Sequence, residues 1–301
     1  TTIMPAMDTP VSNNQALAAR DLRHVWHPCT QMHDHESIPM VPVVRGEGAW
    51  LFDADGRRYL DGVSSWWVNL FGHANPRIAA ALADQARTLE HVIFAGMTHP
   101  PAIELAERLV AVTPPGLTRV NYADNGSSAV EVALKMSFHY WLNKGLGRRT
   151  RFIALSGGYH GETLGALSVS DVALYRKTYA PLLLQPLLVP SPDAYLAEPG
   201  ESAEDVALRR LEDLRATLER HAAETCAVIV EPLVQCATGM RMYHPAYLTG
   251  LRRLCDEFDV HFIADEIAVG FGRTGTMFAC EQADVSPDFM CLSKGLTAGT
   301  M

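Results

Sequence analysis

The sequence has little basic charge and no long apolar run. Its 301 residues carry 34 acidic against 25 basic side chains, which gives a formal net charge of −9. No cluster of Lys and Arg and no interleaving of basic with aromatic residues occurs, and this argues against a nucleic-acid surface. Nowhere do apolar residues run long enough to span a bilayer. With 48% hydrophobic and 20% charged residues, the composition favours a globular chain with a large core.

Cysteine is scarce and lacks metal-binding spacing. No CxxC pair occurs, so no zinc framework is expected, and most thiols stand in apolar runs that suit a reducing compartment. The six are Cys29, Cys226, Cys236, Cys255, Cys280 and Cys291. The first residues, Thr1-Thr2-Ile3-Met4-Pro5, lack the basic and apolar regions of a secretory signal. We therefore expect a cytoplasmic protein.

The first sixty residues predict a small β unit. Segments 49–52 and 58–61 flank Asp53-Ala54-Asp55-Gly56, which is typical of a hairpin whose glycine adopts a positive φ. A short helix is expected at 16–24. The triplet His33-Asp34-His35 resembles a metal cluster, but no second ligand set stands near it at helical or strand spacing. We therefore predict no metal site.

From about residue 119 onward strands and helices alternate. Earlier helices are expected from the Asn75-Pro76 cap towards His91 and after Pro100-Pro101. The pattern then predicts strands at 119–123, 151–155, 187–189, 227–230 and 261–264, and helices at 127–143, 162–168, 203–221 and 245–258, with Ser202 and Asp205 as a capping box. This order indicates an α/β fold with a mostly parallel sheet covered by helices.

The strand at 261–264 ends in a carboxylate, Asp265. An isolated carboxylate in a dry site would neutralise, so it needs a cationic partner. The pyridinium nitrogen of pyridoxal phosphate (PLP) supplies one, and a lysine then holds the cofactor aldehyde as a Schiff base. Only four lysines occur, and Lys294 alone follows an apolar run, at 288–292. Alternatively, Asp265 caps the next loop and Lys294 is a surface lysine.

Two loops and a tryptophan pair are further candidates. Asp124-Asn125-Gly126-Ser127-Ser128 precedes a long helix whose free N–H groups suit a phosphate, or it is a plain N-cap. Gly157-Gly158-Tyr159-His160-Gly161 leaves one ring to stack on a planar cofactor, or it is a mobile turn. Trp66-Trp67 could line a pocket, although the residues alone favour core packing.

These loops, the acid and the lysine converge on the carboxyl edge of one sheet, where α/β folds bind ligands. With Asp265 keeping the ring nitrogen protonated, the cofactor can absorb the electrons of a substrate C–H bond, and the Lys294 amine can carry the proton. That chemistry is transamination, or racemisation if no keto partner arrives.

At these residues the chain resembles the class III, fold-type I PLP aminotransferases, over nearly its whole length. The most specific strings are Trp26-His27-Pro28, Asp61-Gly62-Val63-Ser64-Ser65-Trp66-Trp67, Gly158-Tyr159-His160-Gly161, Gly239-Met240-Arg241-Met242-Tyr243-His244-Pro245 and Asp265-Glu266-Ile267-Ala268-Val269-Gly270-Phe271-Gly272-Arg273-Thr274-Gly275. The Ser-Ser-Trp-Trp and Met-Arg-Met-Tyr-His-Pro strings narrow the resemblance to members that aminate 8-amino-7-oxononanoate in biotin synthesis, with S-adenosylmethionine as donor. Alternatives are an ω-amino acid or ornithine aminotransferase, or an inactive PLP-binding fragment.

The resemblance implies a role for each candidate residue. Lys294 becomes the Schiff-base lysine and Asp265 the pyridinium partner, while Gly126 and Ser127 bind the phosphate. The stacking residue becomes Tyr159, which together with Lys294 also contacts substrate, and Trp66 becomes a wall of the substrate pocket. Supporting positions near the cofactor or substrate are Cys29, Trp67, Glu231 and Gln235. Two positions depart from the family pattern: Cys29 replaces a usual tyrosine, and Glu162 replaces a usual aspartate.

The resemblance also implies a domain division and a partner. Residues 1–62 would belong to a small domain, and residues 63–301 would form the PLP-binding large domain. Homodimers with shared active sites are implied. The chain stops seven residues beyond Lys294 (301 − 294 = 7), where the resemblance implies a further interior strand and the C-terminal part of the small domain. We therefore expect residues 1–301 to be a truncated piece that is poorly soluble or inactive by itself.

Overall fold

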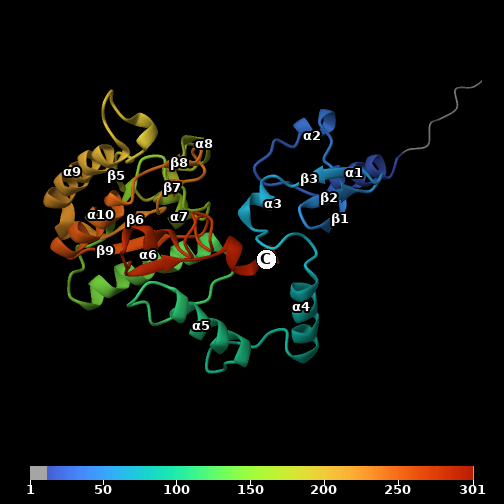
Figure 1. Cartoon of the computed structure of the whole chain (residues 1–301), viewed down its shortest axis with the longest axis horizontal. Helices are drawn as coiled ribbons and strands as arrows, with labels where there is room; N and C mark the ends of the chain where they lie inside the picture. Colours follow the sequence, from blue (N-terminus) through green and yellow to red (C-terminus); the bar gives the residue numbers. More distant parts are fainter. Residues whose placement is uncertain (1–11, 301) are drawn as a thin grey trace, which may run out of the picture. The chain divides into compact units, whose positions relative to one another are not determined.

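The computed structural model describes residues 12–300, and the chain divides into two compact units between His91 and Val92 (Figure 1). The first residues, Thr1-Thr2-Ile3-Met4-Pro5, and Met301 lie outside the described residues. The predicted domain boundary after Gly62 stays a prediction.

The first unit contains a three-stranded antiparallel sheet with short helices. Its elements are α1 (Asn13–His24), α2 (Asp34–Ser37), β1 (Val43–Glu47), β2 (Trp50–Asp53), β3 (Arg58–Leu60), α3 (Ser64–Trp67) and α4 (Pro76–Thr88). The predicted hairpin is confirmed as the β2–β3 pair, and Gly56 in its turn has a φ of 85°. The side chain of Asn75 caps α4, as expected, but this helix ends three residues before His91 because Leu89 is already extended.

The second unit is built on five parallel strands in the order β10-β9-β6-β4-β5. The strands are β4 (Arg151–Leu155), β5 (Leu187–Val189), β6 (Thr225–Val230), β9 (His261–Asp265) and β10 (Phe289–Cys291), and a small pair is β7 (Val234–Gln235) and β8 (Arg241–Met242). The α-helices are α5 (Pro100–Val112), α6 (Gly126–Asn143), α7 (Leu164–Ser168), α8 (Ala173–Arg176), α9 (Ala203–His221) and α10 (Ala246–Glu257). The predicted α/β fold is confirmed.

Short 3₁₀ turns complete the second unit. They are η1 (Ala180–Leu182), η2 (Ala194–Leu196), η3 (Ala222–Glu224), η4 (Ala279–Ala283) and η5 (Lys294–Thr297). The predicted capping box of Ser202 and Asp205 is present at the start of α9. The helix expected from residue 162 begins only at Leu164, because Thr163 is extended.

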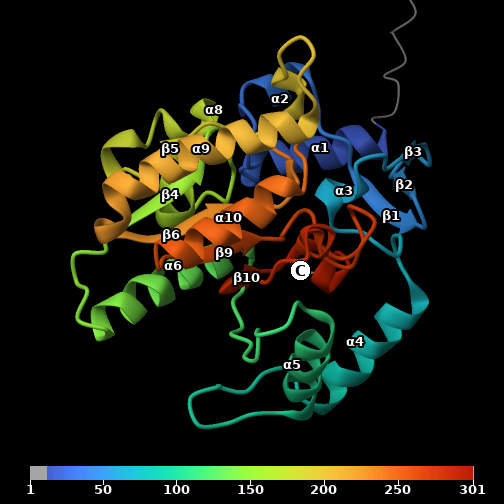
Figure 2. The ribbon, with the colours of Figure 1, turned by 60° about the vertical axis from the view of Figure 1, so that its left-hand side comes forward.

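Alternate residues of the strands pack against different helices. Ile153, Val228 and Phe262 share a core with α9 and α10, whereas Ala154, Ile229 and Ile263 share a second core with α6. Figure 2 shows α9 and α10 on one side of the strands and α6 on the other. Because side chains alternate along a strand, each buried strand supplies both cores at once. This explains why the strands are nearly continuous runs of apolar residues.

The strand predicted at 119–123 is wrong. The segment has no ladder partner among the described residues, and β10 is the edge of the five-stranded sheet. A cavity of about 200 Å³ lies beside both, lined by Val120, Tyr122, Met290 and Leu292 among others. A strand needs a neighbour at about 4.8 Å to form its hydrogen bonds, so the apolar sequence alone does not make one here.

Candidate active site

The site begins where β9 ends in Asp265. The register pairs Asp265 with Cys291, the last residue of β10, so both strands end at the same edge. Asp265 is 4% exposed, and its Oδ1 accepts a hydrogen bond of 3.1 Å from the Ile267 N–H. A carboxylate buried this deeply needs strong partners on both oxygens. The second partner comes from another strand.

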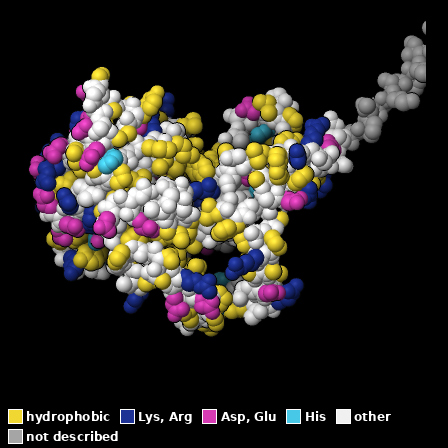
Figure 3. All heavy atoms as spheres, in the orientation of Figure 1, with side chains coloured by type: hydrophobic (Ala, Val, Ile, Leu, Met, Phe, Trp, Pro, Cys, Tyr) yellow, Lys and Arg dark blue, Asp and Glu magenta, His cyan; other side chains and the backbone are white. Residues whose placement is uncertain are grey.

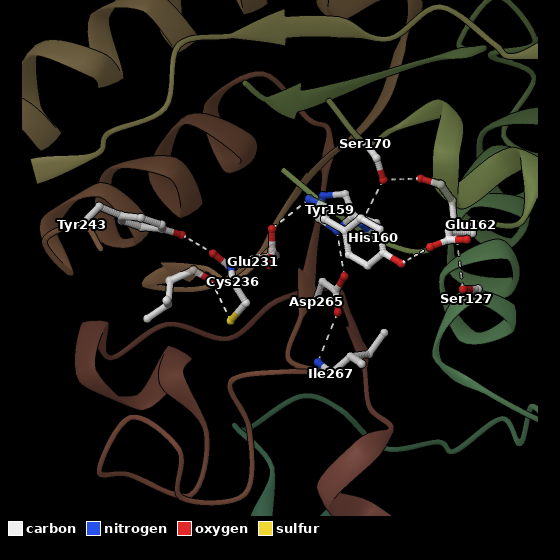
Figure 4. A network of polar contacts seen from close by, with 12 residues as sticks. Ser127, Tyr159, His160, Glu162, Ser170, Glu231, Cys236, Tyr243, Asp265 and Ile267 are labelled. Atoms are coloured by element: carbon white, nitrogen blue, oxygen red, sulfur yellow. Dashed lines mark hydrogen bonds and ion pairs between the residues drawn. The ribbon is translucent and has the colours of Figure 1, made fainter. Parts of the chain in front are cut away.

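His160, on the loop after β4, supplies that partner. Its Nδ1 lies 2.7 Å from Oδ2 of Asp265 (Figure 4). Because a carboxylate only accepts, Nδ1 carries the proton. The His160 backbone N–H donates to Ser170 Oγ at 2.9 Å, which fixes the loop. The Nε2 atom is buried and has no hydrogen-bond partner among the described residues.

Glu231, directly after β6, is a second buried carboxyl group at this edge. Its Oε1 accepts from the Tyr159 N–H at 2.9 Å and its Oε2 from the Cys236 N–H at 3.0 Å. The pKa of Glu231 is raised to about 7, mainly by burial and also by the nearby charge of Asp265, while His160 and the two backbone N–H bonds oppose the shift. Glu231 therefore braces the loop that carries Tyr159 and His160.

Gln235 links two neighbouring loops. Its Nε2 donates to the Ser156 carbonyl at 3.0 Å, and its Oε1 accepts from Ser191 Oγ at 2.6 Å. Next to it, the pKa of the Cys236 thiol is raised to about 12, mainly by burial and by Glu231, against the opposing positive charge of Lys294. Cys236 thus lies within electrostatic range of Lys294.

The N-terminus of α6 lies against the loops that follow β9 and β10. Asn125 caps the helix by accepting from the Ser128 N–H at 2.9 Å. Within residues 12–300 the backbone N–H groups of Gly126 and Ser127 donate no hydrogen bond. A Cβ on Gly126 would stand 3.0 Å from the Ile267 side chain and 3.3 Å from that of Ser293. Two free N–H groups and the helix dipole form a site for an anion.

Tyr159 is held at both ends. Its N–H binds Glu231, and its hydroxyl donates to Glu162 Oε1 at 3.1 Å. The next glycine, Gly161, has a φ of 126°, and a Cβ there would collide with Ser127 Oγ. The glycine therefore lets this loop approach the start of α6.

Lys294 follows β10 at the start of η5. Its φ is 43°, an unfavourable value for a residue with a Cβ. Backbone of this kind persists where surrounding contacts over-determine it, which happens most often at functional sites.

The remaining predicted residues lie in the first unit. Cys29 is exposed with a φ of 56°, Trp67 is half-buried, and Trp66 is 59% exposed. The core role that the residues alone favoured is therefore wrong for Trp66. The side chain of His33 contacts Glu36, and that of His35 contacts Thr30 and the His27 ring. No cluster of potential metal ligands occurs in residues 12–300.

The second unit thus brings together Gly126, Ser127, Tyr159, Glu231, Gln235, Asp265 and Lys294 at one sheet edge. Sequence reasoning missed His160 and Cys236 as members of this group. The signal for His160 was its place between Tyr159 and Gly161, but its burial against Asp265 depends on the order of the strands.

Comparison with known proteins places this geometry in a family. The sequence profile of "Aminotransferase class-III" matches residues 30–301. The chain belongs to the class-III aminotransferase family. It is 48% identical over 94% of its length to the adenosylmethionine-8-amino-7-oxononanoate aminotransferase of Helicobacter pylori, and 45% identical over 99% to that of Geobacter sulfurreducens. This class-III chain spans 63% and 65% of the length of those two relatives.

Solved structures agree with the assignment of this class-III chain. A crystal structure of adenosylmethionine-8-amino-7-oxononanoate aminotransferase from Methanocaldococcus jannaschii superposes with a TM-score of 0.88 at 39% identity, covering 95% of this chain and 63% of that one. An (S)-enantioselective omega-transaminase from Thermomicrobium roseum gives 0.91 at 33% identity, covering 97% and 65%. No helix within residues 12–300 is long and apolar enough to cross a membrane.

Class-III aminotransferases depend on PLP, and one of the similar structures, the omega-transaminase of Pseudomonas jessenii, is a complex with PMP. The residues of this chain fit such a group. The two free N–H groups at α6 suit its phosphate, the buried Asp265 suits a pyridinium nitrogen, and Lys294 provides an amine at the same edge.

Proposed function

We propose that this chain forms the cofactor-binding part of an aminotransferase that converts 8-amino-7-oxononanoate to 7,8-diaminononanoate in biotin synthesis, with S-adenosylmethionine as the donor. The observation that carries the proposal is the convergence of Asp265, the Lys294 loop and the N-terminus of α6 on one sheet edge. The identities of 48% and 45% with relatives named for this substrate support the choice within the family.

Each residue at the edge is assigned one task. Gly126 and Ser127 bind the phosphate through their N–H groups, and Tyr159 stacks on the ring. Asp265 holds a proton on the ring nitrogen, while His160 fixes the orientation of Asp265. Lys294 attaches the cofactor through its amine and contacts the substrate.

When bound, PLP supplies a ring that absorbs negative charge from the substrate carbon. The protein supplies the proton transfers. When free, the Lys294 amine would act as the base that takes the proton from the substrate carbon and returns it two atoms away, to the cofactor carbon that carried the aldehyde. The hydrogen bond between His160 Nδ1 and Asp265 Oδ2 would stabilise the negative charge of Asp265.

Trp66 forms a wall of the substrate pocket, while Trp67 and Cys29 support it. In the second unit Glu231 and Gln235 support the cofactor loops. We further propose the domain division assigned above, with residues 1–62 in a small domain and residues 63–301 in the PLP-binding domain.

We also propose that the enzyme is a cytoplasmic homodimer. All six cysteines are free thiols, which supports a reducing compartment. Large apolar side chains stand exposed between residues 174 and 196, namely Leu174, Tyr179, Leu182, Leu184, Leu188, Tyr195 and Leu196. Figure 3 shows hydrophobic side chains gathered on the visible surface of the second unit. Such a surface supports contact with a second copy.

A direct assay separates this function from the second candidate, an ω-amino acid aminotransferase, which the TM-score of 0.91 to an omega-transaminase favours. The natural gene product, loaded with PLP, is given S-adenosylmethionine with 8-amino-7-oxononanoate, and in parallel an ω-amino acid with a keto acid. We expect diaminononanoate in the first reaction. Turnover of the ω-amino acid alone would replace the proposal with the second candidate.

A further inference from the structure

The short helix α3 (Ser64–Trp67) is left-handed. Four consecutive residues that are not glycine have positive φ angles, 54°, 46°, 67° and 69° from Ser64 to Trp67. The turn is closed by hydrogen bonds of 2.9 Å from the Trp67 N–H to the Val63 carbonyl and 3.0 Å from the Val68 N–H to the Ser64 carbonyl. Residues with a Cβ avoid this conformation, and runs of it are rare. Something must therefore hold it.

Asp61 supplies the main contact to the turn. Its Oδ1 accepts from the Ser65 N–H at 2.9 Å, and its Oδ2 accepts from the Ser65 hydroxyl at 2.7 Å. Both acceptors of one nearly buried carboxylate, with 6% of its side chain exposed, thus fix one residue of the turn. The Ser64 hydroxyl adds a bond of 2.6 Å to the Asn69 carbonyl.

Asp61 is itself held in place by His73. Its Nε2 lies 2.8 Å from Asp61 Oδ2, and its Nδ1 lies 3.1 Å from the Asn69 amide nitrogen. One tautomer satisfies both contacts, because Nε2 donates to the carboxylate while Nδ1 accepts from the amide. The backbone of His73 pairs in both directions with Gly48, between β1 and β2. The turn is thereby tied to the sheet of the first unit.

Trp66, in contrast, has no restraint of its own. Its side chain makes no hydrogen bond or ring contact with any residue the structure describes. The backbone of the turn therefore sets the direction of the Trp66 Cα–Cβ bond, and with it the region that the indole can reach. A right-handed turn at the same place would send the Cα–Cβ bond of Trp66 elsewhere.

We propose that Asp61 and His73 are positioning residues for the amino acceptor: they hold the left-handed turn, and the turn aims Trp66 at the substrate. This inference rests on the proposed role of Trp66 in the substrate pocket. It assigns selectivity to two residues that contact neither substrate nor cofactor.

The test is a double-mutant cycle on the PLP-loaded natural gene product. Asp61→Ala should raise KM for 8-amino-7-oxononanoate roughly tenfold or more, as small misplacements of a positioning group do, with kcat changed by less than about twofold. Asp61→Asn keeps one acceptor for Ser65 and should give a smaller rise. Asp84→Asn, at an exposed ion pair of the same unit, is the matched control and should leave KM unchanged.

The cycle is completed in a Trp66→Ala background. There Asp61→Ala and His73→Gln should raise KM no further, because their effect passes through Trp66. Equal increases in both backgrounds, or an unchanged KM in Asp61→Ala, would overturn the inference.

Fluorescence tests the turn without any substrate. The contribution of Trp66 is isolated by subtracting the spectrum of Trp66→Phe, and Asp61→Ala should shift its emission while Asp84→Asn does not. An unshifted Trp66 spectrum in Asp61→Ala would refute the claim that Asp61 stabilises the left-handed turn. If the parent enzyme lacks activity with 8-amino-7-oxononanoate but the shift occurs, the proposed substrate is wrong, while the stabilisation of the turn by Asp61 is confirmed.

Discussion

The buried sheet edge at Asp265 and the turn at Ser64–Trp67 are polar constructions built in opposite ways. At the edge the partners come from distant parts of the chain: His160 and Asp265 are 105 residues apart, and Tyr159 and Glu231 are 72 apart. In the turn, the longest side-chain bond spans 12 residues, from Asp61 to His73. The edge thus depends on the order of the strands, whereas the turn depends on local bonds that hold an unfavourable backbone.

This difference separates two kinds of control. Groups at the edge are hidden from water, so changing one alters charge, cofactor binding and stability together. Asp61 and His73 at the turn are also largely hidden from water, but their bonds are local, so changing one mainly alters the turn and the direction of the side chain it carries. A substitution at the turn that altered cofactor binding, or one at the edge that altered only substrate affinity, would contradict this distinction.

The largest effect is expected at Lys294. Lys294→Ala removes the amine that attaches the cofactor and transfers the proton, and turnover should fall by roughly 10²–10⁴-fold or more. Steady-state assays with 8-amino-7-oxononanoate measure this. Lys135→Ala, at an exposed position of α6, is the control and should retain activity. Near-normal turnover in Lys294→Ala would show that Lys294, and with it this sheet edge, does not carry out the reaction.

The buried pair itself is tested by His160→Leu. Asp265 would lose the 2.7 Å contact to Nδ1, and losing a hydrogen bond to a buried charge costs roughly 1.5–3 kcal/mol. Urea unfolding should show a loss of this size, together with weaker PLP binding in an absorbance titration. His139→Leu, at an exposed site on α6, should change neither. Equal stability of the two variants would mean that the pair contributes nothing.

Glu231 gives the edge a pH dependence. Burial is the main reason that its pKa is raised to about 7 from an ordinary value near 4.5, so the folded protein binds a proton that the unfolded chain releases. Stability from this group is complete below about pH 4.5 and declines as pH rises through about 7. At about 1.4 kcal/mol per pKa unit, the decline is at most roughly 3.5 kcal/mol.

Comparing the parent with Glu231→Gln isolates this slope. The amide cannot accept both backbone N–H bonds, so the variant loses a constant amount of stability, but its unfolding free energy should fall less steeply with pH. Denaturation curves across this range measure both slopes. Identical slopes would show that Glu231 titrates alike in the folded and unfolded chain.

The smallest effect is expected at Cys29 in the first unit. A thiol offers no aromatic face, whereas Cys29→Tyr could stack on the adenine of S-adenosylmethionine, and a contact of this kind contributes about 1 kcal/mol. The apparent affinity for the donor should improve by roughly fivefold, with Cys29→Ser as the matched control. An unchanged affinity in Cys29→Tyr would show that the position does not contact the donor as proposed.

Much of the edge could be predicted from the sequence. The alternation of strands and helices indicated that the strands end at one edge of the sheet, so Asp265, the Lys294 loop and the start of α6 were expected there, and the structure brings them together. The strand at 119–123 failed because a strand is defined by its ladder partner, which no local pattern reveals.

Other features lay beyond local patterns. The contact of His160 with Asp265 requires β6 to stand between β4 and β9, and periodicity does not give the order of strands. The left-handed turn at Ser64–Trp67 was missed because glycine is the usual sign of positive φ, and none of these four residues is glycine. Bonds from Asp61 and His73 override that local preference.

The most direct test of the central claim is to locate the lysine that binds PLP. The protein is loaded with PLP, reduced with borohydride to make the lysine attachment permanent, digested and analysed by mass spectrometry. The account predicts the label on the peptide that contains Lys294. A label on Lys135, Lys144 or Lys177, or no label on any lysine, would contradict it.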